Sequence, residues 1–382
     1  MMILKIFYVL ILFPLIMVLF ACGTETGPNR TVQNFFDSNT PILSFGADDE
    51  VEKPGVYESI RNYFVDNSGN VYISDNSKFK IDKFDDKGNY LFAFGGKTHE
   101  AIKFPGWIHL FAVNSKQELI AYSAAKRKFL LFTNDGRGFK NEDLSSQLKH
   151  LRIKRLKFDG NDRLFLLTHS DAVGYQLFKY DPGTKEDFLI HTDNKRIRPA
   201  FKDLLPDFDF DAGGNVYITD TIEYRIFKYS STGRLLHTFS KKVKKIKIRE
   251  QDFNFLMQRN RIRKIPNYKE AWKELKGPSG FFPAVFGINI DGKRLYIWTC
   301  PQDPDKKYLV DVYDLDFHHL CTTSFYNEMG NNRVFIKNQR LYTANIGGDD
   351  IDMKRAVGRL GYFNFPYKID AYQISGSRYG AR

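Results

Sequence analysis

The chain has 382 residues, of which 15% are aromatic, and a formal net charge of +12 at pH 7. This length would suit two average domains, although all-β folds built from repeats often form one domain at this size. Residues 241–276 hold 13 Lys or Arg residues and 4 Asp or Glu residues, which is +9 of the total charge. The composition therefore excludes an evenly basic surface and indicates one basic segment suited to a negatively charged partner.

The first residues are typical of an export signal. Lys5 precedes an apolar run over residues 6–20, and Pro14 interrupts this run. Because a membrane-spanning helix needs about 20 apolar residues, the short, interrupted run favours a cleaved signal. The end of the run, Leu-Phe-Ala-Cys at residues 19–22, resembles a bacterial lipobox. The resemblance implies that residues 1–21 are a signal peptide and that Cys22 is lipidated; an uncleaved anchor is the alternative.

The residues after Cys22 bear on the location of the protein. Gly23 stands where an acidic residue would favour retention in the inner membrane, so the lipobox resemblance implies the outer membrane. Residues 22–40 are expected to form a tether between the lipid and the folded part. We therefore expect an exported protein that is anchored to the cell envelope through its N-terminal lipid, and export argues against a nucleic-acid partner.

An internal repeat determines the expected fold. Residues 72–94 align with residues 217–239 at a constant offset of 145 and without a gap. Matched positions share residue type or charge, as in Asp75 with Asp220, Phe79 with Tyr224, Lys80 with Arg225 and Gly88 with Gly233. Each copy is expected to contain four antiparallel strands, with hairpin turns at residues 66–70 and 211–215. Four such strands form one blade of a β-propeller.

The number of blades follows from an aromatic residue near the end of each third strand. These residues are Phe84, Phe132, Tyr180, Tyr229, Tyr313 and Tyr372. We therefore predict an all-β fold, a six-bladed β-propeller of four-stranded antiparallel blades, over residues 41–374. Residues 41–46 resemble the fourth strand at residues 90–95 and are expected to complete the last blade, because closure removes exposed sheet edges. Residues 375–382 are expected to be a flexible tail.

The stretch DNSGNVYISD…KIDKFDDKGNYLFAFG, over residues 66–95, resembles the NHL-repeat family. The resemblance supports the six-bladed propeller. Some NHL-like and related six-bladed propellers are metal-dependent lyases or lactone hydrolases. Their metal-binding His, Glu and Asn positions cannot be matched residue by residue in this chain, and the fold alone does not supply a function.

Propeller connectivity places the candidate binding site. The loops between second and third strands and the links between blades emerge on one face, which we call the mouth; the other turns emerge on the opposite face. Two insertions are expected at the mouth: residues 241–284, partly helical, between the fourth and fifth blades, and residues 345–366 within the sixth. Loops on a rigid scaffold commonly bind ligands. The candidate binding residues are Asp75, Lys80, His169, Asp220, Arg225, Arg259, Arg261, Arg263, Asp349 and Asp350.

Several motifs of catalysis and metal binding are missing from the sequence. It contains no H-E-x-x-H, G-x-S-x-G, Gly-rich phosphate loop or C-x-x-C motif. Asp207, Asp209 and Asp211 alternate as in a calcium loop, but the glycine follows one position late, which favours a strand that runs into a turn. Asp75 and Asp220 are each followed after five residues by a basic residue, which favours ion pairs that shape the loops.

We therefore favour a binding or scaffold role for a peptide, a glycan or a partner protein in the envelope. The alternative is a metal-dependent small-molecule hydrolase or lyase that uses Asp75, His169 and Asp220. No motif indicates a cofactor, and we expect a monomer. Apart from Cys22, the cysteines are Cys300 and Cys321. We expect no disulfide between them, because the third strand of the fifth blade should separate their Cα atoms by more than about 7 Å.

Overall fold

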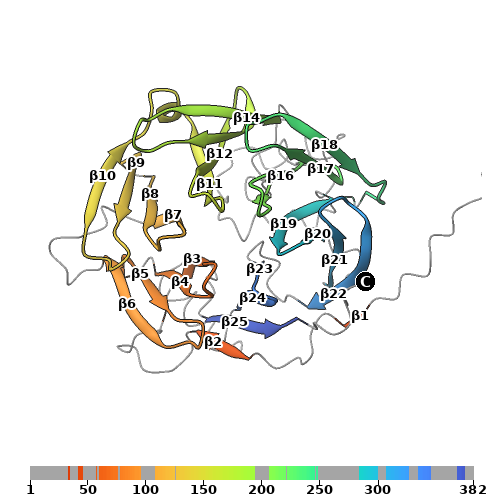
Figure 1. Ribbon diagram of the computed structural model, residues 1–382, viewed down its shortest axis with the longest axis horizontal. Helices are drawn as coiled ribbons and strands as arrows, with labels where there is room; N and C mark the ends of the chain where they lie inside the picture. The colour runs from red at the N-terminus through yellow and green to blue at the C-terminus, as the bar shows by residue number, and fades with distance from the viewer. Residues whose placement is uncertain are drawn as a thin grey trace, which may run out of the picture.

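The chain forms a ring of six four-stranded antiparallel blades, as predicted (Figure 1). The computed structural model describes residues 33–34, 42–45, 57, 60–75, 78–95, 108–124, 126–193, 206–220, 222–245, 247, 284–299, 307–326, 334–345 and 368–374. In five blades the four strands follow chain order from the ring centre to the outside, because each hairpin adds its strand beside the preceding one; in the sixth blade the outermost strand comes from the N-terminal part of the chain (Figure 1).

The first three blades follow one another without strand exchange. The first blade consists of β3 (Ile60–Val65), β4 (Val71–Asp75), β5 (Lys80–Phe84) and β6 (Tyr90–Gly95). The second consists of β7 (Ile108–Val113), β8 (Leu119–Ser123), β9 (Lys128–Phe132) and β10 (Phe139–Asp143). A 3₁₀ turn (Leu148–His150) leads into the third blade. This blade consists of β11 (Arg152–Phe158), β12 (Leu164–Ser170), β13 (Gly174–Tyr180) and β14 (Asp187–Asp193).

The other three blades complete the ring. The fourth consists of β15 (Phe208–Phe210), β16 (Val216–Thr219), β17 (Arg225–Tyr229) and β18 (Leu235–Ser240). The fifth consists of β19 (Val285–Asp291), β20 (Arg294–Thr299), β21 (Lys307–Asp314) and β22 (His319–Tyr326). The sixth consists of β23 (Val334–Lys337), β24 (Arg340–Asn345), β25 (Lys368–Gln373) and the N-terminal β2 (Leu43–Phe45).

The N-terminal strand closes the ring, which confirms the prediction for residues 41–46. Strand β2 pairs antiparallel with β25, with Leu43 opposite Ala371 and Phe45 opposite Ile369. Strands from the two ends of the chain therefore share one sheet, and the edge of β25 is covered. A further short strand, β1 (Gln33–Asn34), pairs in parallel with the outer edge of β22. This pairing was not predicted, and it involves residues of the expected tether.

The predicted aromatic column lies in the third strands and packs between blades. Phe45 contacts Phe84 of the next blade with ring centroids 5.4 Å apart, and Phe239 contacts Tyr313 at 5.0 Å. The corresponding contact between the first and second blades joins Phe94 to Phe132 at 5.9 Å. These aromatic residues therefore belong to the core and hold neighbouring blades together.

Both predicted insertions lie at the predicted connections. Residues 241–284 connect β18 to β19, and residues 346–367 connect β24 to β25. The helix expected within the first insertion and the tail at residues 375–382 lie outside the described residues. Strand β21 lies between β20 and β22, as the prediction for the two cysteines requires. Cys300 itself is not described, so the absence of a disulfide stays a prediction.

Candidate functional site

The structure places five of the predicted binding residues at the mouth. Asp75 ends β4 opposite Lys80 at the start of β5, and the repeat places Asp220 and Arg225 in the same way around the loop from β16 to β17. His169 lies near the end of β12. The other predicted residues, which are Arg259, Arg261, Arg263, Asp349 and Asp350, lie outside the described residues, as does Cys22.

The basic residues of the two loops form ion pairs with carboxylates other than Asp75 and Asp220, and the pairs predicted with those two aspartates stay a prediction. Lys80 pairs with Asp82 at 2.8 Å, and Arg225 pairs with Glu223. Lys80 and Asp82 are two residues apart in one strand, so their side chains lie on the same face of the sheet. Asp220 shapes its loop through the backbone instead, because its Oδ1 accepts N–H groups at 2.8 and 3.0 Å within residues 222–223.

His169 is packed in the third blade. Its side chain is 7% exposed, and its ring centroid lies 4.6 Å from that of Tyr175. The Nδ1 atom lies 4.0 Å from the carboxylate of Asp171, which is largely exposed. A buried ring packed at a tilt against tyrosine stabilises the blade. His169, Asp75 and Asp220 belong to three different blades.

The two ends of the basic insertion are fixed to one loop of the fourth blade. The backbone N–H of Lys241 donates to the carbonyl oxygen of Tyr224, and that of Ala284 donates to the carbonyl oxygen of Ile222, both at 3.0 Å. The ammonium group of Lys241 also lies 2.5 Å from the carboxylate of Asp311 in the fifth blade. The insertion therefore leaves and rejoins the propeller at the loop between β16 and β17.

Asp311 is a buried anchor for this attachment. It is 2% exposed, and its carboxylate accepts hydrogen bonds from Thr322 at 2.6 Å and Tyr224 at 2.7 Å. Burial alone would raise the pKa of Asp311, but Lys241 and the two hydroxyl groups outweigh this effect and hold the pKa below its ordinary value. The carboxylate is thus charged at neutral pH, as an ion pair with Lys241 requires.

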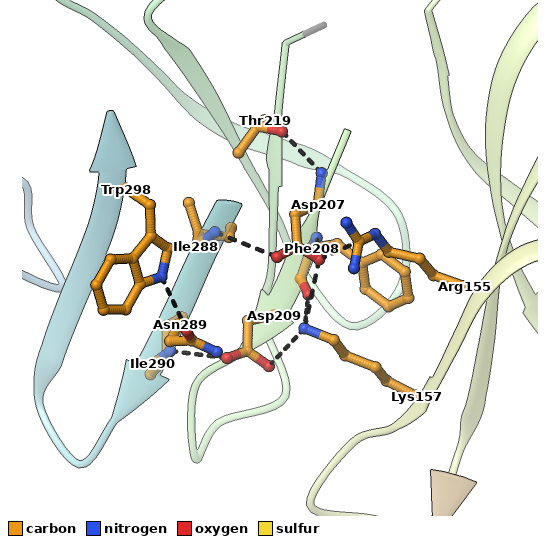
Figure 2. A network of polar contacts seen from close by, with 10 residues as sticks. All are labelled: Arg155, Lys157, Asp207, Phe208, Asp209, Thr219, Ile288, Asn289, Ile290 and Trp298. Atoms are coloured by element: carbon orange, nitrogen blue, oxygen red, sulfur yellow. Dashed lines mark hydrogen bonds and ion pairs between the residues drawn. The ribbon is translucent and has the colours of Figure 1, made fainter. Parts of the chain in front are cut away.

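A second polar network joins the inner strands of the third, fourth and fifth blades near the ring axis (Figure 2). The carboxylate of Asp207 accepts the N–H of Ile288 at 3.3 Å, and that of Asp209 accepts the N–H of Ile290 at 2.7 Å. Because β19 is the innermost strand of its blade, these N–H groups have no strand beside them. The two aspartates therefore satisfy the sheet edge of the following blade.

Basic residues of β11 complete this network. Arg155 lies 3.5 Å and Lys157 lies 3.6 Å from Oδ1 of Asp207, and Lys157 also donates to the carbonyl oxygen of Phe208 (Figure 2). Burial raises the pKa of Asp209, whereas Arg155 and Lys157 overcome burial at Asp207 and lower its pKa. The network thus links three blades through alternating charges.

From sequence, Asp207, Asp209 and Asp211 were compared with a calcium loop and were predicted instead to lie in a strand that runs into a turn. Asp211 instead caps the turn after β15, where its Oδ1 accepts the N–H of Asn215 at 2.9 Å. The predicted strand that runs into a turn is therefore confirmed. Within the described part of the chain, no group of three or more His, Cys, Asp or Glu side chains lies close enough to hold a metal ion.

Exposed basic side chains gather at the mouth of the second and third blades. Lys126 and Arg127 lie in the loop between β8 and β9, and Lys149 and Arg152 lie in or just after the link from β10 to β11. Arg127 donates to the carbonyl oxygen of Lys149 at 2.6 Å, which joins the loop to the link. This cluster, residues 126, 127, 149 and 152, was missed from sequence because its members come from a loop, a link and the start of β11. Within it, Arg152 lies 3.5 Å from the carboxylate of Asp171, which is largely exposed.

On the face opposite the mouth, polar side chains bind the backbone of their own turns. Each of several turns there has an acceptor side chain that binds backbone N–H groups within the same turn. These residues are Asp66, Asp85, Asn114, Asp159, Asp181, Asp211 and Asp314. Such bonds pin hairpin turns and give no distinct ligand site. The mouth is therefore the better candidate for binding.

Comparisons with known proteins support the fold. No protein-family model matches the chain, and no curated protein matches it. A solved structure of a member of the DUF4221 family from Bacteroides vulgatus is 11% identical, with a TM-score of 0.54, over 87% of this chain and 96% of that one. A Bacteroides fragilis protein described as a candidate exported protein is 12% identical, with a TM-score of 0.52, over 90% and 99% of the two chains. At these identities the likeness concerns the propeller fold.

Proposed function

We propose that the chain is an exported, lipid-anchored propeller of the NHL type whose mouth binds a negatively charged ligand of the cell envelope, such as an acidic glycan or an acidic peptide. The observation that carries the proposal is the exposed basic cluster of residues 126, 127, 149 and 152 at the mouth. Like charges held on one surface attract an opposite charge and raise its local concentration.

The basic insertion favours the same kind of ligand. Its ends are fixed at the mouth beside the fourth blade, and exposed Lys242, Lys244 and Lys247 follow the first attachment point. Lys241 is engaged by Asp311, so it serves attachment, whereas the following lysines extend the charge. The likeness to a candidate exported protein agrees with the export that the first 22 residues indicate.

The test measures binding of the purified full chain to three polymers of different charge. Heparin, which is sulfated, and poly-L-glutamate should bind, whereas neutral dextran should not, and added salt should weaken the binding. Replacing both Lys126 and Arg127 with Gln should weaken heparin binding about tenfold, given about 0.5–1 kcal/mol for each exposed charge.

A matched control lies on the opposite face of the same blade. Lys116 and Arg137 are also exposed, but they lie in the turns from β7 to β8 and from β9 to β10. Replacing both with Gln removes the same net charge and should leave the binding unchanged. Equal weakening by the two double variants would show that only net charge matters, and the mouth would lose its assignment.

A further inference from the structure

Exposed apolar side chains gather at one end of the outer strands. Of the nine large apolar side chains that are exposed among the described residues, eight lie directly before the fourth strand of a blade or within its first three residues. These eight, which we call the apolar rim, are Ile42, Tyr90, Leu91, Phe188, Leu189, Leu235, Leu236 and Leu320. Each of these strands runs antiparallel to the third strand beside it and so begins at the face opposite the mouth. The apolar rim therefore lies at the outer edge of the opposite face, in five of the six blades.

A β-bulge places a leucine at this edge in three blades. The pairing of the third with the fourth strand passes over Leu91 in the first blade, Leu236 in the fourth and Leu320 in the fifth. A bulge leaves its extra residue outside the ladder of strand pairing and bends the strand locally. The three leucines are between 41% and 50% exposed. The same backbone feature thus presents the same residue type to the surroundings three times.

The third blade shows that an apolar residue at this bulge can be buried. Its bulge residue is Ile190, which is 6% exposed and packs against the next blade, where a Cβ atom at Gly233 would lie 3.1 Å from Cδ1 of Ile190. The ring of Phe188 lies against the same glycine, so the exposed residues of the third blade adjoin the start of β18. The fold does not require leucines that stay exposed, and apolar side chains that gather on a surface commonly mark a contact with a partner.

The position of the rim fits a flat apolar partner. Strands β6, β18 and β22 lie at the outside of the ring (Figure 1). Because the blades repeat around one axis, the starts of their outer strands lie at one level, and a plane can contact several of them together. A lipid bilayer offers such a plane, and leucine and aromatic side chains on one face of a protein enter the boundary between its headgroups and acyl chains.

The N-terminal strand brings the membrane anchor towards the same face. Strand β1 pairs in parallel with β22, with Gln33 opposite Thr323, so both strands run from the opposite face towards the mouth. Strand β1 therefore begins at its end nearer the opposite face. Cys22 lies 11 residues before Gln33 along the chain, which spans at most about 40 Å when fully extended. An anchor at Cys22, or in the apolar run before it, keeps the ring within this distance of the bilayer.

We propose that the apolar rim rests on the lipid bilayer, so that the opposite face of the ring lies on the membrane and the mouth points away from it. This orientation rests on the proposed anchoring at the N-terminus and adds a second contact with the membrane. It also deepens the proposed function, because the basic mouth then meets its acidic ligand on the side away from the anchoring membrane.

The test locates the rim in the anchored protein. The full chain is purified from membranes and reconstituted into vesicles of phosphatidylcholine, whose headgroups carry no net charge and so do not attract the basic mouth. A fluorophore is attached to Leu91→Cys, Leu236→Cys or Leu320→Cys in a chain that also carries Cys300→Ser and Cys321→Ser. The same chain without a new cysteine gives the background from Cys22. A nitroxide on the phospholipid should quench the three rim labels strongly, and iodide on both sides of the membrane should quench them weakly.

Val173 provides a matched control, because it is 40% exposed but lies in the loop from β12 to β13 at the mouth. A label at Val173→Cys should show the reverse pattern, with strong quenching by iodide and weak quenching by the nitroxide. Rim labels that iodide quenches as strongly as the Val173 label would refute the contact, while the anchor and the mouth would stand. Nitroxide quenching at Val173 instead of the rim would show that the mouth lies on the membrane. Rim labels that neither quencher reaches would show that a second copy of the chain covers the rim.

A loss-of-contact variant tests the leucines themselves. Leu91→Asn, Leu236→Asn and Leu320→Asn together should weaken the contact about a hundredfold, at about fivefold for each half-exposed leucine. A label at Leu189→Cys in this variant should become open to iodide; if the nitroxide still quenches it as in the unchanged chain, the leucines do not make the contact. Thermal melting and heparin binding at the mouth should stay unchanged. A chain that does not float with the vesicles would refute the anchoring and the rim contact together, whereas loss of heparin binding by the unchanged chain would refute only the function of the mouth.

Discussion

Among single residues, Asp82 and Asp311 occupy the same place in two blades, two positions before the aromatic residue near the end of the third strand. Both are almost fully buried. Burial raises the pKa of Asp82 by more than Lys80 lowers it, whereas at Asp311 burial is outweighed by Lys241 and the hydroxyl groups, which lower the pKa. Equivalent positions in the repeat therefore differ in the pH range over which each carboxylate stabilises the fold.

We expect Asp311→Asn to reduce the free energy of unfolding at pH 7 by about 2–3 kcal/mol, because Lys241 loses its buried counter-charge. A folded-state pKa below the unfolded value means that charged Asp311 stabilises the protein above about pH 4, and that this contribution is lost as the pH falls further. The cost of the substitution should therefore shrink in acid. Urea unfolding between pH 3 and pH 7 measures it.

Asp82→Asn is the matched comparison, and the cost of this substitution should change with pH in the opposite direction. A folded-state pKa above the unfolded value means that Asp82 contributes most below about pH 4 and that this contribution is lost as the pH rises through the raised pKa. The cost of Asp82→Asn should therefore be smaller at pH 7 than in acid. The same pH profile for both variants would contradict the assignment of Lys241 as the group that distinguishes the two sites.

Gly287 shows how tightly the network of Figure 2 is packed. A Cβ atom at this position would lie 3.1 Å from Oδ2 of Asp207 and 3.4 Å from a ring carbon of Trp298. Gly287→Ala should displace Asp207 from the N–H of Ile288 and reduce the free energy of unfolding by about 1–2 kcal/mol. Gly160→Ala, where no atom lies within 4 Å, is the control in urea unfolding. Equal urea midpoints for the two variants would contradict the displacement of Asp207 from the N–H of Ile288.

At the scale of strands and loops, the features that were predictable from sequence are those carried by local patterns. The constant offset of the repeat, the turn residues and the third-strand aromatics such as Phe84 depend on one blade at a time, and each blade repeats the pattern. The likeness between residues 41–46 and residues 90–95 was enough to predict ring closure, because the last blade otherwise lacked one strand.

The contacts between blades were not predictable in the same way. The partners of Lys80 and Arg225 proved to be residues of the same strand or loop, since the offset of five residues says nothing about which side chain lies nearer. Asp207 and Asp209 bind the edge of the next blade, about 80 residues later in the chain. No local sequence pattern indicates a contact over that separation. The β-bulges in the inner strands β3, β7, β11 and β19 were found only from the register of strand pairing.

Ring closure gives a prediction for a whole element. Deleting residues 41–46 removes β2, exposes the edge of β25 and takes away the ring of Phe45, which is 2% exposed and contacts Phe84. Loss of a buried phenylalanine alone costs about 3–5 kcal/mol, and an uncovered edge promotes association. We expect a clear drop in melting temperature and some aggregation in size-exclusion chromatography. Removing residues 376–382 is the control, and unchanged melting of the β2 deletion would contradict closure by this strand.

For the molecule as a whole, the two faces of the ring differ in what their polar side chains contact. Turns on one face bind their own backbone through residues such as Asp66 and Asp159, and this fixes the hairpins. The mouth carries the exposed basic cluster, both insertions and the attachment of the basic segment through Lys241. Six blades that share aromatic contacts form a rigid support for loops whose sequences vary from blade to blade.

Cys22 is the residue proposed to carry the lipid anchor. The described residues contain no helix that is long and apolar enough to cross a membrane, and the apolar run at residues 6–20 lies outside them. If Cys22 carries lipid, Cys22→Ser should release mature-length protein into the soluble fraction or leave unprocessed precursor, because a buried acyl chain contributes about 0.8 kcal/mol per CH₂ to membrane binding. Metabolic labelling with a fatty acid and fractionation measure both effects, with Cys321→Ser as the control. Unchanged lipid labelling and membrane retention in Cys22→Ser would exclude a lipoprotein and leave an uncleaved anchor as the explanation.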